Sequence, residues 1–104
     1  MDIEEIQRKV GVGQYAVQPD AVIHAVKEGF TEANMVYAVL HGKIIEEYPE
    51  RDRCLVYADV PIGRRTFMRL HVVCEYWDAE EIHFVTAYVP DPEFWETPVT
   101  RRRR

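Results

Sequence analysis

The chain has 104 residues, a length at which proteins usually fold as one domain around a single core. Hydrophobic residues make up 47% of it, and no apolar run approaches the length of about 18 residues that a membrane-spanning helix needs. The formal net charge of −5 disfavours sequence-independent binding to nucleic acid, which needs basic surface. Because the first ten residues are acidic and unlike a secretory signal, a cytoplasmic protein without membrane contact is expected.

Three helices are predicted within residues 1–42. The first ends at Gly11, the second begins at Pro19 and ends at Gly29, and the third follows an N-cap at Thr31 and ends at Gly42. Apolar residues recur at helical spacing in each, which predicts one buried stripe per helix. These stripes are Ile3, Ile6 and Val10, then Val22, Ile23 and Val26, then Met35, Val36, Val39 and Leu40.

After Gly42 the apolar period changes from 3.6 to 2, which predicts strands. The connections between them are too short for parallel crossovers, so an antiparallel meander is expected. Helices followed by strands indicate an α+β domain, with the N-terminal helices packed on one face of a four-stranded antiparallel sheet and the other face partly open. The predicted strands span residues 43–48, 53–60, 66–77 and 81–89, and residues 90–104 form a tail that ends in four arginines.

The strand predicted over residues 66–77 divides its side chains between two faces. Met68, Leu70 and Val72 point one way, toward the helices, whereas Arg69 and His71 point the other way. A histidine can transfer a proton near neutral pH and an arginine can hold a phosphate, so the pair suits phosphodiester cleavage without a metal. Charged residues are also common on the exposed face of a sheet, and the pattern alone leaves both interpretations open.

The other histidines have structural explanations. His24 lies among apolar residues of the second helix, where a bond to a backbone carbonyl is expected, and His41 lies in the last turn of the third helix, where a cation favours the helix dipole. His83 could join His71 across a strand pair, but no ligand spacing indicates a metal site. Cys54 and Cys74 are expected to be small buried hydrophobes, and no cofactor is expected.

The last predicted strand carries "TAYVPDPEFW". Thr86 and Tyr88 share a face, and Tyr88 could donate a proton or bind a phosphate, although aromatic residues in strands usually serve packing. Phe94 and Trp95 follow the strand and are expected to cover the edge of the sheet or the open end of the core.

Five segments, "IHAV", "VLHGKIIEEYP", "RCLVY", "LHVV" and "VTAYVPDPEFW", occur in the order typical of a bacterial family of small domains. Over residues 15–95 the chain resembles domain of unknown function 4258. That family is regarded as similar to the ribonuclease fold of RelE and barnase, in which helices pack on a four-stranded antiparallel sheet. Its members often resemble toxins that are encoded beside an antitoxin.

The resemblance implies that His24, His71 and Tyr88 are catalytic. Thr86 matches the family pattern as well, and Arg69 would hold the phosphate of an RNA substrate. Where relatives carry arginines after the helical histidine, this chain has only Lys27 beside Glu28, which makes Lys27 the substrate-binding candidate on this helix.

Three functions are compatible with the sequence. The first is a toxin-like, metal-independent ribonuclease with an antitoxin as its protein partner. The second is a non-catalytic interaction module, a homodimer or the partner of a small regulator, that uses the Phe94 and Trp95 end or a sheet edge. The third is a small-molecule pocket, whose lining would be Tyr37, Tyr57, Tyr88 and Trp95.

Overall fold

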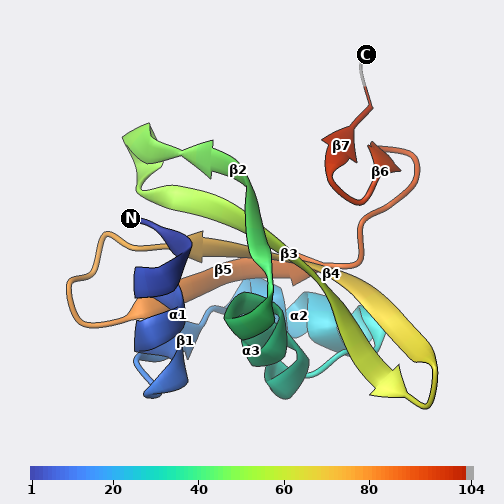
Figure 1. Cartoon of the computed structure of the whole chain (residues 1–104), viewed down its shortest axis with the longest axis horizontal. Helices are drawn as coiled ribbons and strands as arrows, with labels where there is room; N and C mark the ends of the chain where they lie inside the picture. Colours follow the sequence, from blue (N-terminus) through green and yellow to red (C-terminus); the bar gives the residue numbers. More distant parts are fainter. Residues whose placement is uncertain (103–104) are drawn as a thin grey trace.

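The computed structural model describes residues 1–102 as three helices, a central sheet and a small C-terminal hairpin (Figure 1). The three predicted helices and four predicted strands are present, with ends shifted by a few residues. Arg103 and Arg104, the end of the predicted tail, lie outside the described residues. The elements are α1 (Ile3–Gly11), β1 (Tyr15–Val17), α2 (Pro19–Glu28), α3 (Glu32–His41), β2 (Lys43–Tyr48), the 3₁₀ turn η1 (Pro49–Arg51), β3 (Arg53–Gly63), β4 (Thr66–Glu75), β5 (Ile82–Tyr88), β6 (Trp95–Thr97) and β7 (Thr100–Arg101).

Local side-chain chemistry sets the helix ends. Asp2 accepts a hydrogen bond from the backbone of Glu5 at the start of α1. Thr31 and Asn34 form a reciprocal capping box at the start of α3, which satisfies donors that the first turn leaves unpaired. Gly29 ends α2 with φ of 79°, a left-handed conformation that glycine adopts without steric cost.

The central sheet has five strands in the order β1-β5-β4-β3-β2. The prediction of a purely antiparallel four-stranded sheet is therefore wrong in one respect, because β1 adds a fifth strand parallel to β5, with Tyr15 opposite Ile82 and Val17 opposite Phe84. A strand of three residues is too short to show a period of two, and its partner lies far along the chain. The remaining pairs, β2 with β3, β3 with β4 and β4 with β5, are antiparallel as expected.

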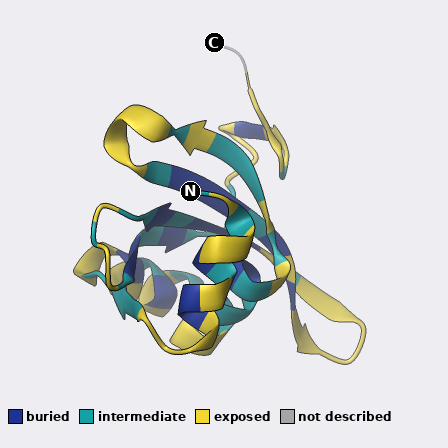
Figure 2. Ribbon diagram, turned by 60° about the vertical axis from the view of Figure 1, so that its left-hand side comes forward, coloured by how far each residue is buried: buried dark blue, intermediate teal, exposed yellow. Residues whose placement is uncertain are grey.

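The helices cover one face of the sheet, and the β6–β7 hairpin lies on the other side (Figure 1). The residues of β4 that point toward the helices, Leu70, Val72 and Cys74, belong to the hydrophobic core, as their alternation predicts. Figure 2 shows buried residues along the central strands and exposed ones at the β3–β4 turn. Within residues 1–102, no helix is both long and apolar enough to cross a bilayer.

Helix α2 does not bury the stripe that its sequence predicts. Ala21 and Ala25 face the core, whereas Val22, Ile23 and Val26 remain 48%, 54% and 80% exposed. The helix packs mainly against β5. Small alanine side chains allow a close helix–sheet approach, so the larger apolar residues turn outward and form an exposed apolar strip on this helix.

Candidate functional site

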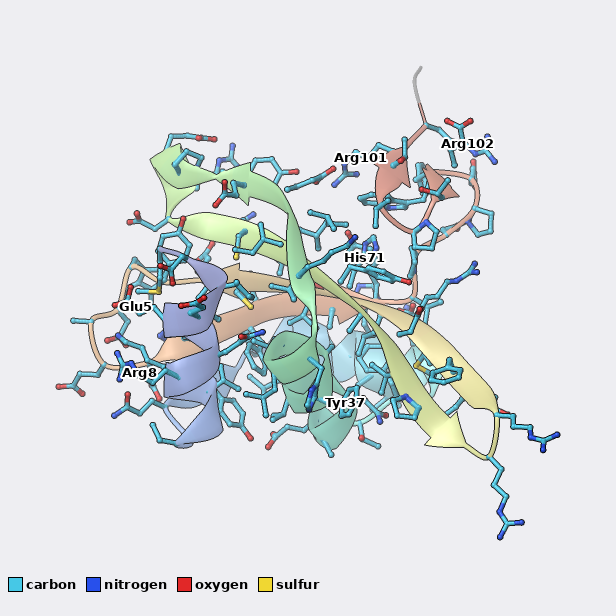
Figure 3. The ribbon with its side chains drawn as sticks, in the orientation of Figure 1. Glu5, Arg8, Tyr37, His71, Arg101 and Arg102 are labelled. Atoms are coloured by element: carbon cyan, nitrogen blue, oxygen red, sulfur yellow. The ribbon has the colours of Figure 1, made fainter. Side chains whose placement is uncertain are left out.

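The C-terminal hairpin covers the part of the second sheet face around His71. Trp95 is 5% exposed, and its ring meets the His71 ring edge-on with 4.5 Å between centres. The guanidinium of Arg101 lies over the Trp95 ring, 4.5 Å from its centre, in a cation–π contact. Arg101 projects from the hairpin (Figure 3). Its Nε and Nη2 donate to the two carboxylate oxygens of Glu46 at 2.8 and 3.0 Å, which ties β7 to β2.

His71 is fully buried beneath this hairpin. Its Nε2 lies 2.6 Å from the carbonyl oxygen of Pro98, so Nε2 carries the proton in the neutral ring, and Nδ1 has no hydrogen-bond partner among residues 1–102. Tyr57 and Tyr88 complete the surroundings, with ring centres 5.8 and 5.2 Å from that of His71. The imidazole therefore lies on the predicted face, which the sequence predicts to be partly open, but the hairpin covers that face at His71.

Burial lowers the pKa of His71, an effect that the Pro98 carbonyl and Glu46 oppose and that Arg101 reinforces. In the unfolded chain the pKa is about 6.5. Between the folded and unfolded values the unfolded chain binds more protons, so stability is expected to fall as the pH drops below about 6.5. For one titrating proton, the free energy of unfolding changes by at most about 1.4 kcal/mol per pH unit.

Urea denaturation between pH 7.5 and 5.0 measures this dependence. His71→Gln keeps an N–H donor for Pro98 and cannot titrate, so it should flatten the profile in this range. An equal slope in wild type and variant would contradict the assignment of His71 as the titrating group.

A hollow of about 420 Å³ opens where β5 meets α2 and the hairpin. We call it the edge hollow. Two of the predicted site residues, His24 and Tyr88, line it together. The other residues of the lining that carry polar or aromatic groups are Glu28, Asp91, Phe94, Trp95 and Arg101.

His24 is held by carboxylates and not by the backbone carbonyl that its sequence context predicts. Its Nδ1 lies 2.5 Å from Oε2 of Glu28, one helical turn further along α2, and its Nε2 lies 3.7 Å from Oδ2 of Asp20. The other oxygen of Glu28 accepts a hydrogen bond from the backbone of Val89 at 2.9 Å, so this carboxylate connects α2 to the end of β5. With Nδ1 bound to Glu28, Nε2 of the ring is the nitrogen available for proton transfer.

Tyr88 is one of the residues that line the edge hollow. Desolvation by burial is the largest cause that raises its pKa, and Arg101 opposes the rise. The phenol therefore stays protonated at neutral pH and can act as a donor.

None of the predicted substrate-binding residues, Arg69, Lys27 and Thr86, lines the edge hollow. Arg69 is exposed and lines a second hollow of about 740 Å³, which meets the edge hollow at Val89. Lys27 is exposed on α2, and Thr86 lies in β5 opposite Val73 of β4.

Two other sequence expectations change. His83 pairs with Glu75 across the sheet, whereas Tyr88 is the residue opposite His71, so His83 and His71 do not meet. The four aromatic residues expected in one pocket are divided: Tyr88 and Trp95 line the edge hollow, Tyr57 lines the second hollow, and Tyr37 packs against His41 within α3.

Sequence reasoning missed Glu28 and Arg101. Glu28 could have been predicted as a partner of His24, because it follows His24 by four positions and residues four apart on a helix are neighbours. Arg101 belongs to an arginine run that gave no signal of its own, and its partner Glu46 lies 55 positions away.

Comparison with known proteins identifies one family and nothing more specific. No curated protein and no solved structure matches the chain significantly. The family described as Domain of unknown function (DUF4258) matches residues 18–94, a segment that includes His24, His71 and Tyr88 and ends just before Trp95. Because this match spans most of the chain, the protein belongs to the DUF4258 family.

Proposed function

We propose that the protein is a toxin-like ribonuclease that cleaves RNA without a metal ion. One observation supports the proposal most directly: the His24–Glu28 pair, Tyr88 and Arg101 line a single hollow. These groups supply a base, an acid and a cation within one site. Such a site moves protons and stabilises the charge that develops on a phosphate.

In the proposed reaction, Nε2 of His24 takes the proton from a ribose 2′-hydroxyl. The 2′-oxygen then bonds to phosphorus while the bond to the 5′-oxygen breaks. Tyr88 gives its proton to the leaving 5′-oxygen, and Arg101 stabilises the negative charge on the phosphoryl oxygens. The products are a 2′,3′-cyclic phosphate and a 5′-hydroxyl, and proton exchange with water restores both side chains.

The remaining predicted residues have supporting roles in this proposal. His71 acts by positioning, because its ring packs edge-on against both Tyr88 and Trp95. Arg69 and Lys27 would contact phosphates of the RNA beside the edge hollow. Thr86, two residues before Tyr88 on β5, would contact the substrate from the sheet.

A basic stretch in the middle of the chain supports an RNA substrate despite the acidic total. Residues 51–73 carry five arginines against two aspartates, and the exposed Arg69 lines the second hollow, which meets the edge hollow at Val89. A local basic surface is what a polynucleotide backbone requires. We also propose a cytoplasmic protein with an antitoxin as its partner, which would have to cover the edge hollow to block cleavage.

The test is incubation of the purified protein with single-stranded RNA in the presence of EDTA. Cleavage that continues in EDTA is the expected result. RNA that stays intact over a long incubation at high protein concentration would reject the proposal.

A second candidate function is homodimerisation through α2, which the exposed apolar strip favours. Val22, Ile23 and Val26 lie between Asp20 near the start of the helix and Lys27 near its end, and all five are exposed. In an antiparallel pairing of two α2 helices, each Asp20 would face the partner's Lys27 around an apolar centre. A two-fold interface requires this kind of self-complementarity.

Sedimentation analysis tests this candidate. The wild type should be a dimer at micromolar concentration, and Ile23→Asp should make it a monomer because a carboxylate would be placed in the apolar centre. Val12→Asp changes another exposed apolar residue, after α1, and should leave the dimer intact. A wild type that stays monomeric over the whole concentration range would exclude this interface.

A further inference from the structure

Three side chains with metal-binding atoms meet at the end of the sheet away from the edge hollow. They are Asp78 and Glu81 in the β4–β5 connection and His83 in β5. One ligand atom from each can be chosen so that all three lie within 4.8 Å of one another. His83 and Tyr88 lie near opposite ends of β5, so this cluster is separate from the proposed ribonuclease site and independent of it.

The cluster is built around a buried histidine, which separates it from an ordinary group of surface acids. His83 is 8% exposed, and its ring stacks on Trp77 with 4.6 Å between centres and 17° between planes. Its Nε2 points at Oδ2 of Asp78, 3.1 Å away. The stacking and the burial fix the direction of the ligand nitrogen before any metal arrives.

Groups outside the cluster hold these side chains in place. Oδ1 of Asp78 accepts a hydrogen bond from the backbone of Glu80 at 2.9 Å, which leaves Oδ2 toward His83. On the far side of the ring, the amide of Gln18 lies 2.7 Å from Nδ1 of His83. Metal-binding histidines nearly always have such a partner on the second nitrogen. When Nε2 binds a metal, the neutral ring carries its proton on Nδ1. With the Gln18 amide turned so that its oxygen meets Nδ1, that oxygen would accept a hydrogen bond from the Nδ1–H group.

The donor set selects the class of metal. One imidazole and two carboxylates suit zinc and related divalent transition metals, whereas magnesium and calcium prefer oxygen ligands alone. Glu81 is only partly buried and lies in the β4–β5 connection, so rotation of its side chain can bring its carboxylate to the ion. Water would take the fourth position of a tetrahedral zinc ion.

We propose that Asp78, Glu81 and His83 form a binding site for a divalent transition metal such as Zn²⁺. The ion would join the β4–β5 connection to β5. Through Gln18, whose backbone N–H also donates to the carbonyl of Phe84 at 2.9 Å, the site would connect to the start of α2. Bound metal is therefore expected to raise the melting temperature, because an ion that binds only the folded chain shifts the unfolding equilibrium.

Calorimetric titration of the tag-free full-length chain with Zn²⁺ tests the site. One saturable site and a rise in melting temperature are expected, with no such effect from Mg²⁺. Glu81→Gln should weaken zinc binding by at least about tenfold, and Gln18→Ala by about 10- to 100-fold. Among residues 1–102 the Glu81 carboxylate takes part in no described hydrogen bond or ion pair, so Glu81→Gln should fold normally.

Two control variants make the result specific. Glu80→Gln removes the neighbouring carboxylate that is outside the cluster, and His24→Gln removes the other histidine that contacts two acidic residues. Both should bind Zn²⁺ like the wild type. The proposal is overturned if no saturable binding occurs at millimolar Zn²⁺, if Glu81→Gln binds as tightly as the wild type, or if Glu80→Gln weakens binding as much as Glu81→Gln does.

Discussion

His24→Gln is expected to reduce RNA cleavage by about 10²- to 10⁴-fold, the range that a general base contributes. The amide keeps a donor near Glu28 but cannot take a proton from a 2′-hydroxyl. His24 is partly exposed, with 37% of its side chain accessible, so its loss should leave the fold intact. Initial rates with a fluorescent single-stranded RNA in EDTA measure the effect, and circular dichroism checks folding.

A matched variant separates catalysis from the loss of any histidine. His41→Gln changes an exposed histidine at the end of α3, where its ring packs against Tyr37, and it should cleave at the wild-type rate. Tyr88→Phe keeps the ring contact with His71 and should lower the rate through loss of the proton donor. Equal activity in His24→Gln and the wild type would remove His24 from the reaction.

Trp95→Ala is expected to cost about 3–5 kcal/mol of unfolding free energy, as truncation of a buried aromatic residue usually does. Trp95 contacts both His71 and Arg101. Its removal eliminates the ring contact with His71 and the cation–π contact with Arg101. The hairpin would then be held by the ion pair between Arg101 and Glu46 and by the hydrogen bond from His71 to the Pro98 carbonyl. Urea denaturation measures the change.

Trp77→Ala is the matched control for this experiment. Trp77 is 60% exposed, so the same substitution should cost about 1 kcal/mol from its stacking on His83. If the two variants lose the same stability, or if Trp95→Ala loses less than about 1 kcal/mol, the hairpin does not pack on the sheet as described.

The regular elements could be predicted because their signals are local. The Thr31 cap, the stop at Gly29 and the alternation of Leu70 and Val72 with Arg69 and His71 need no knowledge of distant residues. The failures concern tertiary choices. β1 is three residues long and joins a partner more than 60 positions away. On α2, the choice between burying alanines and burying valines depends on how closely β5 approaches the helix.

The candidate site, too, could be predicted from local patterns only in part. The side of the sheet on which His71 lies follows from alternation, but its burial depends on Trp95 and Pro98, which belong to a segment beyond the last predicted strand. His24 and Tyr88 meet because α2 packs along β5. Arg101 joins them through Glu46, and no local pattern around either residue indicates that contact.

The most direct test of the ribonuclease proposal uses a DNA oligonucleotide that contains one ribonucleotide, incubated with the protein in EDTA. Attack by the 2′-oxygen predicts a cut only after that nucleotide, with a 2′,3′-cyclic phosphate on one product and a 5′-hydroxyl on the other. An uncut oligonucleotide, or cleavage that is equally fast at deoxynucleotides, would contradict the proposed chemistry of the edge hollow.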